Sequence, residues 1–201
     1  LREICDTHGI LLVFDEVICG FGRTGKAFAA QSFGVTPDII TMAKALTNGA
    51  LPMGAVAVDD EIYDTVVNAA PENAVELFHG YTYSGHPTAC AAGLAALEIY
   101  EKENLFERAA ELSPYFLDQV YSLQDLNAVT DIRGYGLIAG FDVAMGDAPG
   151  QRGTQLQKDL FWSGLHVKFT ADTGIVAPPL IAEKEHIDEI VEMLRENLAE
   201  I

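Results

Sequence analysis

Basic side chains are scarce in this sequence. Of its 201 residues, 12 are Lys or Arg and 30 are Asp or Glu, which gives a formal net charge of −18. A protein that binds nucleic acid needs a basic face to neutralise phosphates, so this balance argues against nucleic acid as a partner. We interpret the acidic excess as a property that keeps the protein soluble.

Long apolar runs and paired cysteines are also lacking. No run approaches the roughly 18 residues that a membrane-spanning helix needs, so we expect no membrane partner. Cys5, Cys19 and Cys90 are odd in number, far apart and without metal-ligand spacing. We therefore expect free, mostly buried thiols, no bound metal and a reducing compartment, the cytoplasm.

The start of the sequence lacks an initiating Met and a signal-peptide pattern. Its first eight residues are typical of the end of an amphipathic helix, which Gly9 would close. We expect the chain to be a piece of a longer protein.

Strand and helix patterns alternate in the first half of the chain and change afterwards. The first half predicts strands at 10–14, 39–42 and 54–58 and helices at 28–33, 60–70, 87–103 and 105–123, which is an α/β pattern. The second half predicts a small α+β domain, with strands at 128–132, 137–143, 165–169 and 174–177 and helices at 154–163 and 183–200. We therefore predict two domains, residues 1–123 and residues 124–201.

Two of the predicted strands lead directly to an ionisable residue. Ile10–Phe14 precedes Asp15, and Ile39–Met42 is followed by Ala43 and Lys44. Both strands read as buried, and ligands of open α/β sheets bind outside the carboxyl ends of the strands. An amine and a carboxylate at that edge suit pyridoxal phosphate, because the lysine can hold the cofactor as a Schiff base and the acid can pair with its pyridinium nitrogen.

Each of these two residues also has a simpler interpretation. Lys44 can be a surface lysine at the end of a strand. Asp15 can be a helix cap or half of a structural ion pair, because a buried carboxylate needs hydrogen bonds or a charged partner. The pairing of the two residues favours the cofactor interpretation.

Two loops carry further candidate residues. Gly20–Ala27 nearly matches a nucleotide-binding P-loop, but Ala27 replaces the hydroxyl residue that reaches magnesium. We interpret the glycines as shaping an active-site loop, with Arg23 as a structural or anion-contacting residue. Phe78–Pro87 precedes a helix start and is rich in hydroxyl groups, which suits phosphate binding, whereas the alternative is an ordinary loop capped by Ser84. We expect His79 and His86 to be structural, because they lack metal-site spacing.

Several of these segments together resemble one family, the class III pyridoxal-phosphate aminotransferases. The resemblance covers essentially the whole chain, and the most similar subgroup is the ω-amino acid (β-alanine)–pyruvate aminotransferases. It rests on the segments Leu12–Gly25, Ala43–Gly49, Leu51–Ala55, His79–Pro87, Asp131–Gly134, Thr170–Thr173 and Ala177–Leu180.

The resemblance implies a fold, a cofactor and roles for single residues. The fold would be part of the type I large domain, a mostly parallel sheet with helices, followed by the small α+β domain. Lys44 would be the Schiff-base lysine and proton carrier, Asp15 would pair with the pyridine nitrogen, and Val17 would pack on one ring face. Thr82 would donate to the cofactor phosphate of the other subunit, which implies a homodimer.

The resemblance also implies where this chain departs from the family. Family members are roughly twice as long, and their first half carries a phosphate-binding loop and an aromatic residue that stacks on the ring. Lys168 stands where relatives carry an arginine that binds the substrate carboxylate, and a lysine offers a point charge in place of a bidentate fork. Arg133 is a possible substitute, and its other interpretation is a structural arginine at a strand end.

The main hypothesis from the sequence is transamination between an ω-amino acid or amine and a 2-oxo acid such as pyruvate. An aminomutase or decarboxylase of the same fold uses the same residues and stays open. A non-catalytic fragment, which contributes only an interaction surface, also stays open.

Overall fold

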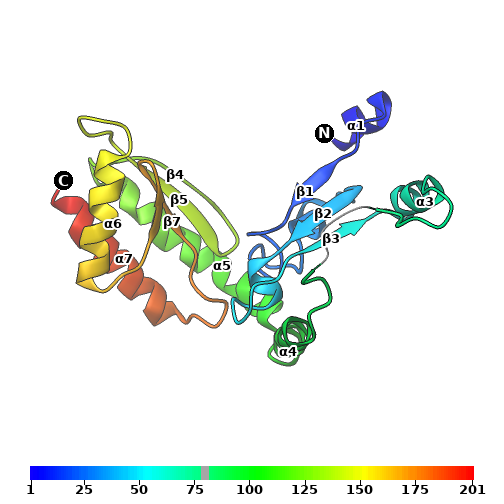
Figure 1. The fold of residues 1–201 in the computed structure, drawn as a ribbon. Coiled ribbons are helices and arrows are strands. Elements are labelled where there is room, and N and C mark those ends of the chain that lie inside the picture. The colour runs from blue at the N-terminus through cyan, green and yellow to red at the C-terminus, as the bar shows by residue number, and fades with distance from the viewer. Residues whose placement is uncertain (78–81) are drawn as a thin grey trace. The chain divides into compact units, whose positions relative to one another are not determined.

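The fold consists of two compact units in a computed structural model that describes residues 1–77 and 82–201. The predicted loop residues Phe78–Tyr81, His79 among them, lie outside the described residues. Unit 1 comprises Leu1–Phe21 and Lys26–Asn104, and unit 2 comprises Gly22–Gly25 and Leu105–Ile201. Each unit has its own sheet (Figure 1).

Unit 1 is built on a three-stranded sheet in the order β1-β2-β3. Strands β1 and β2 run parallel, and β3 is antiparallel to β2. The elements of this unit are α1 (Arg2–His8), β1 (Val13–Asp15), α2 (Ala29–Phe33), β2 (Ile39–Met42), η1 (Lys44–Leu46), β3 (Ala55–Val58), α3 (Asp60–Asn68) and α4 (Pro87–Lys102).

Glycine and proline set the ends of several elements of unit 1. Gly9 and Gly34 close α1 and α2 in the left-handed conformation (φ 61° and 63°), which glycine adopts without steric cost. Pro87 occupies the first turn of α4, where its missing N–H costs nothing. Asp59 caps α3 by accepting a hydrogen bond from the Glu61 N–H.

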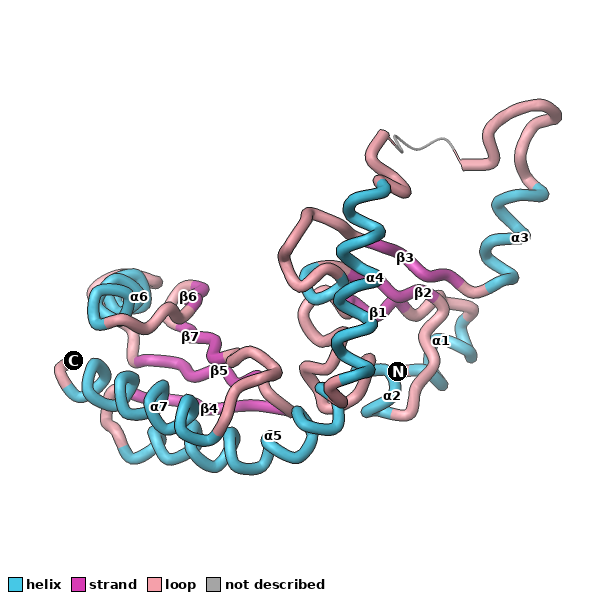
Figure 2. Tube along the Cα trace, turned by 90° about the horizontal axis from the view of Figure 1, so that it is seen from below, coloured by secondary structure: helices cyan, strands magenta, loops and turns pink. Residues whose placement is uncertain are grey.

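The expected burial of the first strand is wrong for this chain. Ile10, Leu11 and Val13 keep 54%, 56% and 51% of their surface exposed, and only Val13–Asp15 forms the strand. The reason is that few elements of unit 1 cover its sheet. Helices α1 and α3 lie beyond the ends of the strands and do not cross their faces (Figures 1 and 2).

Unit 2 is a four-stranded antiparallel sheet packed on helices. The strand order is β4-β5-β7-β6, and alternate residues of β5 are buried, so one face of the sheet meets the core. The elements are α5 (Leu105–Tyr121), η2 (Ser122–Asp125), β4 (Val129–Tyr135), β5 (Ile138–Val143), α6 (Gln151–Ser163), β6 (Lys168–Thr170), β7 (Thr173–Val176) and α7 (Lys184–Ala199).

The core of unit 2 joins its three long helices to the sheet. Apolar side chains that are at most 2% exposed come from the helices and from the sheet: Ala109, Phe116, Val120, Leu123, Leu137, Ala139, Phe141, Leu156, Leu160, Ile187, Leu194 and Leu198. Helix α5 belongs to this unit, although the predicted domain boundary lies later, between residues 123 and 124. That boundary concerns the domains of the longer family members and stays a prediction.

The glycine-rich loop packs its glycines against other side chains. A Cβ on Gly22 (φ 107°) would lie 2.7 Å from the Phe106 ring, and one on Gly25 (φ 80°) would lie 2.9 Å from Ala110. Arg23 donates to the carbonyl oxygens of Leu137 (3.0 Å) and Pro178 (2.5 Å), which favours the structural alternative of its two interpretations. These contacts pack the segment Gly22–Gly25 tightly against other residues of unit 2.

Two further findings concern membrane-spanning helices and groups of metal-ligating residues. Within 1–77 and 82–201, no helix is long and apolar enough to cross a membrane, and no three His, Cys, Asp or Glu residues are grouped to hold a metal ion. Cys5, Cys19 and Cys90 form no disulfide bond, as expected, but they are half-buried, whereas mostly buried thiols were expected.

Candidate active site

The carboxylate of Asp15 stands at the carboxyl end of β1. Its Oδ1 accepts hydrogen bonds from the Val17 N–H at 3.0 Å and from the Thr41 hydroxyl at 3.3 Å. Thr41 is the residue opposite Asp15 on β2. Both donors bind the same oxygen, Oδ1. The other oxygen of the carboxylate, Oδ2, can therefore accept a hydrogen bond from a further donor.

The neighbouring carboxylate, Glu16, has a different task. It is 1% exposed and accepts hydrogen bonds from the Ala29 N–H (3.0 Å) and the Ala30 N–H (2.8 Å), the first backbone groups of α2. Glu16 therefore serves as the helix cap that was an alternative interpretation of Asp15. Sequence reasoning missed this role, because the two partners lie 13 and 14 residues away and no local spacing signals the contact.

Lys44 follows β2 by two residues and starts the short helix η1. It is exposed, and its backbone is left-handed with φ 45°, an unusual conformation for a residue with a side chain. Its carbonyl accepts from the Thr47 and Gly49 N–H groups at 3.3 and 3.2 Å. Strained backbone of this kind persists only where the surroundings enforce it, and it gathers at functional sites.

The sheet register brings Asp15 and Lys44 to the same end of the strands. Asp15 pairs with Thr41, and Met42 pairs with Ala55 at the start of β3. The carboxyl ends of β1 and β2 and the first residue of β3 therefore share the same edge, with Lys44 two residues beyond Met42. Open α/β sheets bind their ligands outside this end of the strands.

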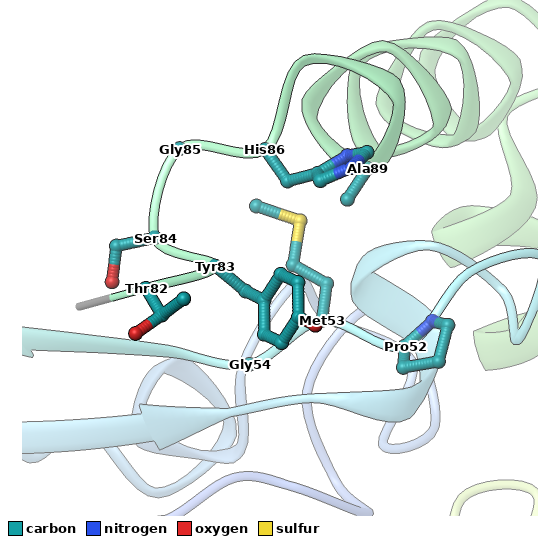
Figure 3. A pocket seen from close by; sticks show the side chains of 9 residues that line it. All are labelled: Pro52, Met53, Gly54, Thr82, Tyr83, Ser84, Gly85, His86 and Ala89. Atoms are coloured by element: carbon teal, nitrogen blue, oxygen red, sulfur yellow. The ribbon is translucent and has the colours of Figure 1, made fainter. Parts of the chain in front are cut away.

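Thr82 lines a cavity of about 320 Å³ beside the start of β3. The other lining residues are Pro52, Met53, Gly54, Tyr83, Ser84, Gly85, His86 and Ala89. Figure 3 shows the Thr82–His86 loop arching over Met53 and Gly54, with the loop leading into the first turn of α4. Three of the lining residues, Thr82, Tyr83 and Ser84, carry a side-chain hydroxyl, and His86 carries an imidazole.

Lys168 is the first residue of β6, one of the two edge strands of the sheet in unit 2. Its side chain is exposed. The strand is fixed to α6, because the Gln157 side-chain oxygen accepts from the Phe169 N–H at 3.1 Å, and the Phe169 ring stands edge-on to Phe141 at 5.6 Å. Lys168 thus places an exposed positive charge on a strand that is fixed by the contacts of Phe169.

Arg133 is engaged by carboxylates of its own sheet. It donates to Asp142 at 2.8 and 3.1 Å and to Asp131 at 2.7 Å. The hydrogen bonds from Arg133 and then from Thr173 lower the pKa of Asp142, and the two carboxylates raise the pKa of Arg133. These contacts favour the structural interpretation of Arg133 over a role as the substitute for the family arginine.

The donor set at the edge of unit 1 fits pyridoxal phosphate. A carboxylate oriented by a backbone N–H and a threonine suits a protonated ring nitrogen, and a lysine amine on the adjacent strand end suits the cofactor aldehyde. The hydroxyl-lined cavity suits a phosphate group.

Comparisons with known proteins point to one family. The sequence model of the family described as aminotransferase class-III matches residues 1–198. The omega-aminotransferase of Caulobacter vibrioides is 52% identical over 202 residues, which cover 100% of this chain and 46% of that protein. The beta-alanine–pyruvate aminotransferase of Pseudomonas aeruginosa is 49% identical, over 98% of this chain and 45% of that protein.

Solved structures agree with the sequence comparisons. The (S)-enantioselective omega-transaminase from Thermomicrobium roseum superposes with a TM-score of 0.90 at 38% identity, over 99% of this chain and 45% of that chain. A transaminase studied with L-alanine gives a TM-score of 0.92 at 33% identity, over 99% of this chain and 48% of that chain. The chain thus spans about half the length of the relatives it matches.

Proposed function

This chain belongs to the class-III aminotransferase family, and on that premise we propose that the protein it forms transfers an amino group with pyridoxal phosphate as cofactor. The amino donor is an ω-amino acid or an amine, and the acceptor is a 2-oxo acid such as pyruvate. Relatives named for beta-alanine, omega-amino acids and pyruvate, 48% to 49% identical, support this substrate class.

One observation carries the proposal. Asp15 is the last residue of β1 and Lys44 lies two residues beyond β2, and the register of these adjacent parallel strands places their carboxyl ends side by side. Pyridoxal phosphate, when bound, supplies an electron sink that stabilises negative charge on the carbon beside the amino group. A negatively charged Asp15 at the ring nitrogen keeps that nitrogen protonated, which strengthens the sink.

The other residues of the proposed site have separate tasks. The Lys44 Nζ holds the cofactor and then, as a free amine, takes a proton from the donor carbon and returns one during transfer. Val17 contacts one face of the ring. The Thr82 hydroxyl donates to the phosphate held by a second copy of the protein, which makes a homodimer part of the proposal.

Lys168 is proposed to bind the substrate carboxylate. An exposed ammonium on a held edge strand provides a point charge, which attracts a carboxylate with less geometric selection than a guanidinium does. We therefore expect Lys168→Arg to lower the KM for the 2-oxo acid while kcat changes little. An unchanged KM would remove Lys168 from the site.

The decisive experiment measures amino transfer from β-alanine to pyruvate in the full natural polypeptide that carries this sequence. Lys44→Ala should abolish turnover, whereas Lys26→Ala, which removes a lysine outside the proposed site, should retain it. Near-normal turnover by Lys44→Ala would contradict the proposal. Product formation without any added 2-oxo acid would indicate an aminomutase or a decarboxylase, because transamination needs an acceptor.

A further inference from the structure

Tyr100 connects helix α4 to the backbone beside Lys44. Its side chain is 6% exposed, and its hydroxyl donates to the Ala45 carbonyl at 2.7 Å. Ala45 directly follows Lys44, whose φ of 45° is the strained feature of this segment. The hydroxyl therefore holds the peptide unit next to the residue that bears the proposed amine.

The ring of Tyr100 contacts a second strained residue. It stacks on Phe21 with ring centroids 6.4 Å apart and planes inclined by 25°. Phe21 has φ 62°, again left-handed for a residue with a side chain, and lies in the loop that follows Asp15. One buried tyrosine thus touches the loops that follow both candidate strands.

Helix α4 is shaped for this close approach. Its buried residues Ala89, Gly93, Ala96 and Tyr100 follow helical spacing, so they form one stripe of small side chains that ends in the tyrosine. A Cβ on Gly93 would lie 3.5 Å from the Leu46 carbonyl oxygen. The small residues bring the helix axis near η1, and Tyr100 spans the remaining gap with a polar group.

We propose that Tyr100 is a positioning residue for Lys44, an inference that rests on the proposed function of that lysine. Left-handed backbone at Lys44 is costly and persists only if the surroundings fix it. The Tyr100 hydroxyl supplies that fixation, and without it the segment 44–49 samples less strained conformations. The Lys44 amine then loses its defined place relative to Asp15.

The test compares Tyr100→Phe with the matched control Tyr63→Phe in the full natural polypeptide. The first variant removes one hydroxyl and keeps the ring on Phe21, and the second removes an exposed hydroxyl on α3. Hydrogen exchange of backbone amides in residues 43–51 is measured without cofactor. Loss of one buried hydrogen bond should raise that exchange about fivefold in Tyr100→Phe, with helices α1 and α3 unchanged.

A second readout separates positioning from structural support. In the protein with bound pyridoxal phosphate, the pH midpoint of the visible absorbance reports the amine that holds the cofactor, and it should move in Tyr100→Phe and stay in Tyr63→Phe. The inference would be overturned if amide exchange of residues 43–51 were unchanged in Tyr100→Phe. It would also be overturned if that exchange were faster but the pH midpoint of the absorbance stayed at the wild-type value. If Lys44→Ala retains the wild-type band and midpoint, the proposed function fails, whatever the exchange of residues 43–51 shows.

Discussion

Two adjacent carboxylates at the end of β1, Asp15 and Glu16, have different surroundings. Glu16 is buried and satisfies two N–H groups of α2, whereas Asp15 is exposed and is oriented by Val17 and Thr41. Because Glu16 caps the helix, Asp15 is not needed there. This division predicts opposite phenotypes for substitutions at neighbouring positions.

At Asp15 the expected loss is catalytic. Asp15→Asn keeps an oxygen for the Val17 N–H but removes the charge, so kcat for amino transfer should fall about 100-fold, as for other removed electrostatic contacts. The free energy of unfolding should change little, because the side chain is exposed. Asp64→Asn on α3 serves as the control. A kcat within twofold of wild type would show that Asp15 does not touch the reacting system.

At Glu16 the expected loss is structural. Glu16→Ala leaves two buried N–H groups without their acceptor, which should lower the free energy of unfolding by about 2 kcal/mol. Glu16→Gln retains one acceptor oxygen and should lose less. Urea unfolding followed by circular dichroism measures both variants, and equal stability of wild type and Glu16→Ala would contradict the capping role.

At the scale of elements, a contact that is distant in sequence determines where α6 begins. Asp172, in the turn between β6 and β7, accepts from the Gly150 N–H at 2.7 Å and the Gly153 N–H at 3.0 Å. This contact caps α6, so the helix starts at Gln151, three residues before the predicted start at 154. It also ties the β6–β7 hairpin, which carries Lys168, to α6.

The cap has a pH dependence whose direction follows from the structure. Hydrogen bonds from the Gly150 and Gly153 N–H groups lower the pKa of Asp172 below 3.8. A carboxyl with a lowered folded-state pKa stabilises the fold above its unfolded pKa, and that contribution disappears as the pH falls through the folded-state value. Asp172→Asn should therefore lower stability at pH 7 and weaken its decline below about pH 4.

The measurement is urea unfolding of both proteins between pH 3 and pH 7, with Asp147→Asn as the control in an exposed loop. The wild-type and Asp172→Asn curves should converge towards the acid end. Parallel curves across the whole range would show that the Asp172 carboxylate does not contribute through its charge.

The bounds of several elements could be predicted from the sequence, whereas contacts between distant residues could not. The strand Ile39–Met42 was predicted with its observed bounds, and α4 and α5 within two residues, because local periodicity and Pro87 determine them. The caps by Glu16 and Asp172 depend on partners 13 to 22 residues away, which periodicity does not detect. The burial of the first strand depends on what covers the sheet, and Ile10 and Leu11 are exposed in this chain.

At the scale of the whole molecule, the two units differ in how much apolar surface they bury. The largest fully buried apolar side chains among the described residues, such as Phe116, Phe141 and Leu194, belong to unit 2. Unit 1 leaves Ile10, Leu11 and other apolar side chains of its sheet region exposed. Burial of apolar surface is the main stabilising contribution to folding, so unit 2 should be the more stable one.

This difference predicts the behaviour of the separated units. A polypeptide of residues 105–201, which is unit 2 without Gly22–Gly25, should unfold in one cooperative thermal transition, because it contains all the large buried apolar side chains of unit 2. Residues 1–104 alone should show no sharp transition and should bind a hydrophobic dye. Circular dichroism melts test both, and a cooperative melt of residues 1–104 with none for 105–201 would contradict this account.

The central claim is that Lys44 is the amine that holds pyridoxal phosphate at the sheet edge beside Asp15. The most direct test adds the cofactor to the protein, reduces the mixture with borohydride and locates the modified residue by peptide mass spectrometry. The account predicts one phosphopyridoxyl group per chain, on Lys44, and its loss in Lys44→Ala. Modification spread over surface lysines, or concentrated on a different lysine, would contradict it.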